Sequence, residues 1–289
     1  RSINAYRGCE HGCIYCYARP THAYHDLSAG LDFESRLFAK PDAAKILRET
    51  LAKPKYRPAP IAMGTNTDPY QPIERQYRIT RQVLEVCLET RHPVTITTKS
   101  DRVLDDLDLL AEMARLGLAA VAVSVTTLDP RLSGKLEPRA AAPAKRLEAL
   151  GRLVEAGVPT HCSVSPVIPA ITDEFMEDIV ARAGALGVLS AGWIPLRLPH
   201  EVSPLFREWL EVHFPERAAK VMAIVRSIRA GRDNDPEFFS RMNPQGVWAD
   251  LFRARFRLAR KRAGMAQARI ELDCSGFRRP DAGGQLRLI

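Results

Sequence analysis

Short apolar segments alternate with amphipathic segments along most of this chain, and the alternation restricts the folds that it can adopt. The apolar segments are rich in β-branched and small residues, as buried parallel strands are. Between them, apolar residues recur at helical spacing, as Leu147, Leu150, Leu153 and Val154 do before the terminating Gly157. Repeats of this kind predict an α/β fold with a parallel sheet.

Six strands and the helices between them can be placed on the sequence. The predicted strands are Ser2–Tyr6, Pro60–Gly64, Val94–Thr98, Ala119–Val125, Thr160–Val167 and Gly192–Leu196. The predicted helices are Asp42–Leu51, Thr80–Thr90, Val103–Leu116, Ala144–Ala156 and Asp173–Ala185. We therefore expect residues 1–198 to form a partial (β/α)6 barrel of the TIM type, whose chemistry lies on the loops after the carboxyl ends of the strands.

The pattern changes after residue 198. Helical patterns follow at Ser203–Val212, Glu216–Ala230 and Val247–Ala263, and a last strand pattern at Arg269–Leu272. We expect residues 199–289 to form a helical, basic extension that packs on the barrel.

Positive charge is concentrated in this extension. The chain of 289 residues has a formal net charge of +8, and residues 195–289 hold 18 lysines and arginines against 11 acidic residues. The segment Arg253–Arg262 contains six of these cations. An apolar stripe accompanies them at Trp248, Leu251, Phe252, Phe256 and Ala259. Such a helix predicts nucleic acid as a partner; a solvated helix surface or a helix lying on a membrane are the alternatives.

Composition and cysteine usage exclude several classes of protein. The sequence contains no run of 18 apolar residues, so it predicts no membrane-spanning helix. Residues Arg1–Gly8 lack the apolar core of a secretory signal. Arg1 is not a methionine, so we expect the native chain to begin further upstream. The six cysteines do not form the paired pattern of a small secreted domain. We expect a reduced, cytoplasmic protein.

The most specific motif is the segment GCEHGCIYCYA, which holds Cys9, Cys13 and Cys16 directly after the first predicted strand. Three thiolates on one tight loop can bind three irons of a [4Fe–4S] cluster and leave the fourth iron without a protein ligand. S-adenosylmethionine (SAM) can fill that position with its amino and carboxylate groups, and an electron from the reduced cluster then releases a 5′-deoxyadenosyl radical. We expect these two cofactors, with an electron donor such as a flavodoxin or ferredoxin as partner.

Two other metal sites would use the same cysteines. A structural zinc ion could take His11, His22 or His25 as its fourth ligand, although no second pair of close cysteines exists. A ferredoxin-type cluster needs a fourth cysteine, and the next along the chain is Cys87. The zinc alternative corresponds to a non-catalytic, metal-stabilised binding protein, which metal analysis distinguishes from an iron–sulfur enzyme.

These residues resemble the radical SAM superfamily, and within it the branch related to spore photoproduct lyase. Tyr15 and Tyr17 flank the third cysteine as in that branch, and Thr65–Asp68 resembles its Cys-Thr-Ser-Asp stretch. The other similar positions are Lys99 at the end of the third predicted strand, Ser124 in the fourth, Glu137–Pro138 after it, and the signature Thr67–Glu74.

The resemblance implies roles for several of these side chains. Thr67, Lys99 and Ser124 would hold the polar end of SAM, and the Lys99 ammonium would pair with its carboxylate. Tyr17 would contact the cofactor, and Tyr15 and Tyr17 would take part in radical relay. An exposed lysine, ordinary strand residues and aromatic packing under the loop are the alternatives for these positions.

The chain departs from the lyase pattern at the hydrogen-donor cysteine, whose position is occupied by Thr65. A hydroxyl holds its hydrogen far more strongly than a thiol does, so Thr65 cannot easily return a hydrogen atom to a substrate radical. Cys162 is a candidate for a displaced donor, although a buried core residue is the commoner role. Arg139 and Arg197 are candidate substrate-binding residues, whereas Arg146 fits an exposed helix face.

Together these observations predict a radical SAM enzyme with lyase-like chemistry on a nucleic acid or nucleotide substrate. The departure at Thr65 argues against spore photoproduct lyase activity itself. The alternative is radical SAM modification of a peptide or small metabolite, which a lack of salt-sensitive nucleic acid binding would favour.

Overall fold

A computed structural model describes residues 1–237, 239–265 and 270–280 of the chain. At its centre, six strands pair in parallel in the order β1-β4-β5-β6-β7-β8. They are β1 (Ser2–Ile3), β4 (Ile61–Met63), β5 (Val94–Thr98), β6 (Ala119–Ser124), β7 (Thr160–Val167) and β8 (Ser190–Pro195). Among the described residues β1 and β8 do not pair with each other, so the barrel stays open. The predicted partial barrel is confirmed.

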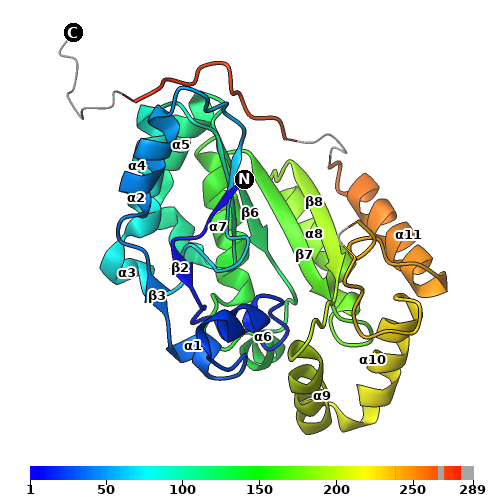
Figure 1. Ribbon diagram of the computed structural model, residues 1–289. Helices are drawn as coiled ribbons and strands as arrows, with labels where there is room; N and C mark the ends of the chain where they lie inside the picture. Colours follow the sequence, from blue (N-terminus) through cyan, green and yellow to red (C-terminus); the bar gives the residue numbers. More distant parts are fainter. Residues whose placement is uncertain (238, 266–269, 281–289) are drawn as a thin grey trace.

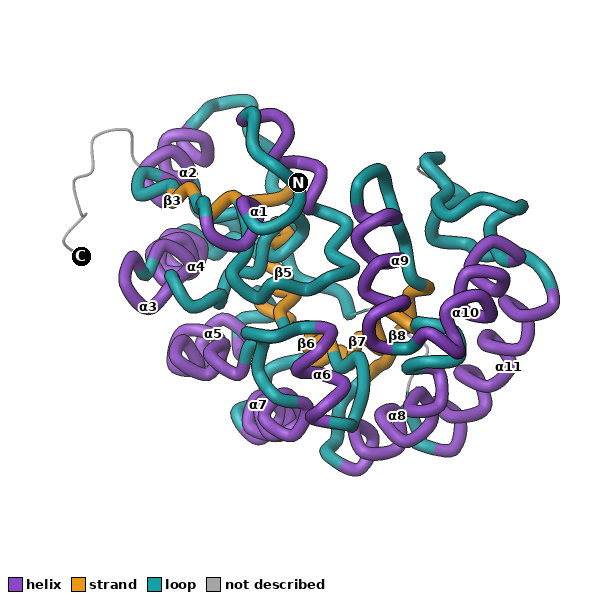
Figure 2. Tube along the Cα trace, turned by 90° about the horizontal axis from the view of Figure 1, so that it is seen from below, coloured by secondary structure: helices purple, strands orange, loops and turns teal. Residues whose placement is uncertain are grey.

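Each crossover between neighbouring strands carries a helix on the outer face of the sheet (Figure 1; Figure 2). These helices are α2 (Ala43–Ala52), α4 (Ile79–Glu89), α5 (Leu107–Arg115), α7 (Pro143–Glu155) and α8 (Met176–Ala185). Shorter elements lie in the loops: β2 (Tyr6–Arg7), α1 (Asp32–Ser35), β3 (Phe38–Ala39), α3 (Glu74–Tyr77), α6 (Pro130–Leu136) and the 3-10 helices Arg19–His25, Asp101–Asp106 and Asp173–Phe175.

The two faces of the sheet differ in the size of their side chains. Successive strand residues point to opposite faces, and Val121, Val123 and Val164 on the outer face pack in the main core under the helices. Ala120, Ala122 and Ser163 alternate with them on the inner face. These small side chains leave space inside the open barrel, where cavities lie.

Four predicted elements differ from the structure in extent or type. The strand predicted at Ser2–Tyr6 ends at Ile3, because the chain leaves the sheet and Tyr6–Arg7 pair with β3 instead. The helices predicted at Val103–Leu116 and Asp173–Ala185 each begin with a 3-10 turn. The last predicted strand, Arg269–Leu272, is wrong where it is described, at 270–272; Arg269 lies outside the described residues. Isolated hydrogen bonds hold this segment, such as Asp273 N–H to the Gly117 carbonyl at 2.9 Å, and no ladder forms there.

In the described part of the chain, three helices follow β8: α9 (Val202–His213), α10 (Pro215–Ser227) and α11 (Val247–Arg262). Helix α11 packs beside α8 through Phe252 and Phe256, which join the main core. The predicted apolar stripe of α11 is narrower in the structure, because Trp248 and Leu251 are 37% and 44% exposed. Among the described residues, no helix is long and apolar enough to cross a membrane.

Helices α9 and α10 contribute to a second core on the far side of the cysteine loop. Phe206 and Trp209 of α9 pack there with Leu136 of α6, and the cluster extends to Cys13 and Tyr15. The Trp209 indole N–H donates to the Lys135 carbonyl at 3.0 Å and ties α9 to α6. The chain after β8 therefore covers the loop that carries the cysteines, while a domain boundary at residue 198 stays a prediction.

Candidate functional site

A cavity of about 180 Å³ lies at the carboxyl ends of the central strands. It brings together most of the residues that the sequence singles out. Its lining includes Cys9, Cys13, Cys16, Tyr17, Thr67, Lys99 and Ser124. His11, Asp68, Ser163 and Ser165 also line it. The cavity therefore lies where the fold predicts the chemistry of a parallel barrel.

All three cysteines on the loop are free thiols. Cys9 and Cys13 are buried and Cys16 is half-buried. Burial raises the pKa of each thiol, to about 12 for Cys13, because a thiolate loses hydration in this position. Without a metal the thiols are therefore protonated at neutral pH, and metal binding must release these protons.

The cavity lining holds the three thiols that a [4Fe–4S] cluster requires, together with His11, one of the three candidate zinc ligands. Among the described residues, no group of three or more His, Cys, Asp or Glu side chains is arranged to hold a metal ion. His22 and His25, considered as zinc ligands, contact the Arg36 carbonyl and Arg7 instead. In a [4Fe–4S] cluster each thiolate binds a different iron, so three thiols around one cavity are the arrangement required.

Arg19 holds the cysteine loop from beneath. Its side chain is 1% exposed, and it donates to the Cys13 carbonyl at 2.9 Å and to the Gly12 carbonyl at 3.1 Å. Glu34 neutralises the guanidinium at 2.5 Å. Sequence reasoning missed this residue; its position three residues after the last cysteine is the available signal.

The signature segment after β4 braces the same loop from the other side. The Thr67 hydroxyl donates to the Gly8 carbonyl at 2.6 Å, and Gln71 Nε2 donates to that carbonyl at 3.2 Å. Gln71 also accepts from the Glu10 N–H at 2.9 Å, and the Glu10 carboxylate accepts from the Ile73 N–H at 2.6 Å. Four hydrogen bonds thus fix the cysteine loop to a segment about 60 residues further along the chain.

Lys99 places a charge inside the cavity. Asp68 fixes its backbone by accepting from the Lys99 N–H at 2.7 Å, and from the Thr98 hydroxyl at 2.7 Å. Burial acts to lower the pKa of Lys99, but nearby negative charge, which includes the Glu137 carboxylate, raises it overall, so the ammonium stays charged. Among the described residues, no carboxylate lies within 4 Å of this ammonium. Its charge is therefore available to an anionic ligand.

Comparison with known proteins identifies the family. The model of the radical SAM superfamily matches residues 3–183. The chain belongs to the radical SAM superfamily. An uncharacterized protein of Mycobacterium tuberculosis is 36% identical over 230 residues, which cover 78% of this chain and 67% of that protein. An uncharacterized protein of Methanocaldococcus jannaschii is 28% identical over 218 residues, 74% of this chain and 76% of that protein.

Solved structures show which radical SAM fold the chain shares. A mutant of spore photoproduct lyase matches with a TM-score of 0.64 at 14% identity, over 90% of this chain and 73% of that chain. The same lyase complexed with a dinucleoside spore photoproduct matches with a TM-score of 0.61 at 14% identity, over 89% and 72%. The chain is a radical SAM enzyme with the fold of this lyase, and its family implies SAM and an iron–sulfur cluster as cofactors.

Behind the cysteine loop, this radical SAM enzyme has a buried charged network centred on Glu137. The Glu137 carboxylate accepts from the Tyr15 hydroxyl, from the Thr126 hydroxyl at 2.6 Å and from the Arg146 guanidinium. Burial alone would raise the pKa of Glu137, but Arg146 and Lys99 lower it to about 2. Tyr15 is thus held as a hydrogen-bond donor behind Cys13 and does not line the cavity.

The expectation that Arg146 lies on an exposed helix face is wrong. Its side chain is 1% exposed, and it also donates to the Ser124 carbonyl at 3.1 Å. Arg146 precedes Leu150 by four residues and Leu153 by seven, so it lies on the apolar side of α7. The helical period contained this information, but a lone arginine is rarely buried without a partner, and Glu137 is that partner.

Tyr17 forms part of the cavity wall and reaches toward solvent. Its ring is 46% exposed, and its hydroxyl donates to the Thr65 carbonyl. The Arg197 guanidinium lies 5.2 Å from the centre of the ring, outside the cavity lining. Thr65 itself is exposed and bonded to Asn4. The structure therefore groups Tyr17 with Arg197 at the rim of the site.

Two further predicted residues lie away from the cavity. Arg139 pairs with Glu34 and donates to the Glu10 carbonyl, so it clamps the cysteine loop. Cys162 is 0% exposed and lies in the main core, on the opposite face of β7 from Ser163. These positions bring no support to the prediction of substrate binding by Arg139 or of hydrogen donation by Cys162.

Proposed function

We propose that this radical SAM enzyme binds a [4Fe–4S] cluster through Cys9, Cys13 and Cys16 and binds SAM beside it, in order to act on a nucleic acid or nucleotide. One observation carries the proposal. The three thiols line the same cavity as the charged Lys99 ammonium and Ser124. When bound, the cluster supplies the electron that cleaves SAM to methionine and a 5′-deoxyadenosyl radical.

The remaining residues bind, orient and shield. Lys99 pairs with the SAM carboxylate, and Ser124 offers its hydroxyl to the same polar end. Thr67 holds the Gly8 carbonyl with its hydroxyl, so its role for SAM is to fix the cysteine loop. Tyr17 closes the wall of the cavity toward Arg197. The second core excludes water from the side of Cys13 and Tyr15.

Two observations support a nucleic acid or nucleotide substrate. Spore photoproduct lyase, whose fold this enzyme shares, has been solved in complex with a dinucleoside spore photoproduct. In addition, the chain carries 18 of its 42 lysines and arginines in residues 195–289, next to the barrel. An electron donor of the flavodoxin or ferredoxin type and a cytoplasmic location complete the proposal.

Anaerobic reconstitution tests this function. Protein supplied with iron and sulfide should bind close to four of each per chain, and with dithionite and SAM it should form 5′-deoxyadenosine. The triple variant Cys9→Ala, Cys13→Ala, Cys16→Ala should do neither. Cys274→Ala, which changes a half-buried thiol outside the cavity, is the matched control and should retain both. Bound zinc without iron, or equal iron in the triple variant, would overturn the assignment.

A further inference from the structure

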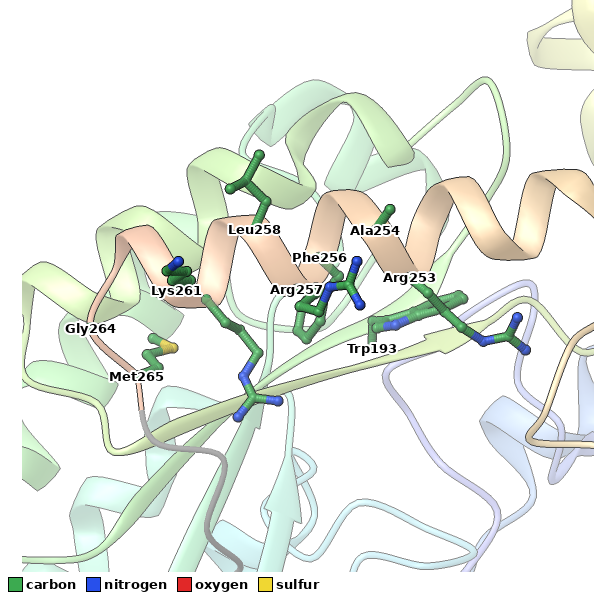
Figure 3. A pocket seen from close by; sticks show the side chains of 10 residues that line it. Trp193, Arg253, Ala254, Phe256, Arg257, Leu258, Lys261, Gly264 and Met265 are labelled. Carbon is green, nitrogen blue, oxygen red and sulfur yellow. The ribbon is translucent and has the colours of Figure 1, made fainter.

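A larger cavity of about 1010 Å³ runs along one side of α11 (Figure 3). We call it the α11 groove. The residues that line it are Trp193 on β8 and, from α11 onward, Arg253, Ala254, Phe256, Arg257, Leu258, Arg260, Lys261, Gly264 and Met265. Four of these carry positive charge and none carries negative charge. The groove is therefore a strongly basic hollow with an aromatic wall.

The cations of α11 are divided between two sides of the helix. Arg255 faces α8, where it binds Glu177 at 2.6 Å and Asp173 at 3.1 Å, so its charge is neutralised. Arg257 and Lys261 face the groove and have no carboxylate within 4 Å among the described residues. They are four residues apart, so they lie on one face with a rise of about 6 Å between them. This spacing presents a row of available cations to an extended anionic chain.

Trp193 gives the groove a flat aromatic surface. In Figure 3 its ring lies below α11, between the side chains of Arg257 and Arg253. The ring is half-buried, and one edge packs on Phe252 with centroids 6.0 Å apart. A cationic groove with an aromatic ring in its wall is the arrangement that binds single-stranded nucleic acid, whose unpaired bases can stack on the ring. Bases of a duplex are stacked on one another and cannot reach it.

The groove has a neighbouring cavity on the inner face of the sheet. Arg260 lines both the groove and a cavity of about 330 Å³ on the inner face of the sheet. Thr97 lines both that inner cavity and the cavity of the cysteines. Ala120 and Ala122 also line the inner cavity, where their small side chains leave space. Three cavities therefore follow one another from the α11 groove to the cavity of the cysteines, and each shares one lining residue with the next.

We propose that the α11 groove binds single-stranded nucleic acid, with phosphates on Arg257 and Lys261 and a base against Trp193. The inference rests on the proposed function for the class of substrate, but the strand is bound by residues outside the cofactor cavity. Binding can consequently be measured separately from SAM cleavage.

Fluorescence anisotropy with a labelled thymidine dodecamer, across a salt series, tests the cations on the reconstituted enzyme. Each phosphate contact adds about −0.7 to the log–log slope on a single strand. The variant Arg257→Ala/Lys261→Ala should flatten the slope by about 1.4 and weaken binding at low salt by about tenfold or more. Lys220→Ala/Arg262→Ala removes the same charge from exposed positions outside the groove and should change neither.

Tryptophan fluorescence tests the stacking. Addition of the dodecamer should quench part of the emission of the enzyme, because a stacked base quenches the indole. Trp193→Phe should lose this quenching, whereas Trp248→Phe, which changes a tryptophan of α11 outside the groove, should keep it. A uridine dodecamer shows whether RNA is bound as DNA is.

Each of the following results would overturn the groove proposal: equal losses in the two double variants, tighter binding of duplex than of single strand, or quenching that persists in Trp193→Phe. Formation of 5′-deoxyadenosine is measured on the same preparations. Cleavage of SAM without binding of the strand refutes only the groove proposal. Binding of the strand without cleavage of SAM refutes only the proposed function. Unchanged circular dichroism of each variant excludes misfolding as the cause.

Discussion

Replacing Arg146 by methionine should destabilise the protein by about 3–5 kcal/mol at neutral pH. Methionine keeps much of the aliphatic volume but removes the guanidinium that faces Glu137 and the Ser124 carbonyl. Because the Glu137 side chain is 0% exposed, its charge would remain in the core without its main partner. The cost therefore comes from an uncompensated buried carboxylate rather than from a lost surface ion pair.

The pKa of Glu137 gives an independent magnitude. The network lowers it from 4.5 to about 2, which corresponds to about 3 kcal/mol of stability at neutral pH. Since the folded-state pKa lies below the unfolded one, this stability is present above pH 4.5 and is lost as the pH falls toward 2. The difference in stability between wild type and Arg146→Met should therefore narrow below about pH 4.5.

Urea unfolding of the anaerobic protein, followed by circular dichroism at several pH values, measures both effects. Arg152→Met on the same helix is the matched control, because that side chain is 54% exposed, and it should cost under about 0.5 kcal/mol. The double variant Arg146→Met/Glu137→Leu should be more stable than Arg146→Met alone, since it removes both buried charges. Arg146 is not the main partner of the Glu137 charge if Arg146→Met costs no more than Arg152→Met, or if the double variant is less stable than Arg146→Met alone.

Three further predictions concern the site. Lys99→Ala should weaken SAM binding by about 1–3 kcal/mol in an equilibrium titration without changing the iron content; unaltered affinity would contradict its pairing with the SAM carboxylate. Gly12→Ala should lower the midpoint of thermal unfolding and the retention of the cluster, because a side chain at its φ of +67° costs about 1–2 kcal/mol and the new methyl would lie 2.4 Å from Arg139. The control Gly134→Ala, where the new methyl would have no atom within 4 Å, should be neutral or stabilising. Equal unfolding midpoints of the two variants would show that the cysteine loop is not constrained at Gly12. Cleavage of spore photoproduct in ultraviolet-irradiated DNA, followed by chromatography, should be weak or absent even where SAM is cleaved, because Thr65 occupies the position where the resemblance to the lyase implies a donor cysteine. Efficient, multiple-turnover repair would contradict this, and its loss in Cys162→Ala would identify Cys162 as the replacement donor.

Hydrophobic pattern alone was sufficient for two of the central strands. The predicted bounds of β5 and β7 agree with the structure, because alternate residues of both strands are buried on the face that the helices cover. The first predicted strand is too long. It ends before Asn4, whose side chain accepts from the Asn66 N–H at 2.9 Å where the chain leaves the sheet. A bond across more than sixty positions leaves no periodic trace in the sequence.

The same limit applies to the site. The cysteines and Lys99 are recognisable from spacing and from the end of a strand, and the structure places them around one cavity. Gln71 and Arg19 hold the cysteine loop through its backbone carbonyls, so the side chains of the loop do not predict these two contacts. The sequence shows six cations in the segment of α11 but not how they are divided. The side on which Phe252 and Phe256 pack decides which arginines contact α8.

The second core has a consequence for how this enzyme can be cut or recombined. Leu196 and Leu198, which precede the proposed boundary, pack in the same cluster as Phe206, Leu210 and Cys13. A truncated chain that ends at residue 198 would expose this apolar surface beside the cysteine loop, so it should aggregate or lose iron rather than behave as an autonomous barrel. Chimaeras with a related enzyme should therefore exchange α9 and α10 together with the cysteine loop and α6, because these segments share one core.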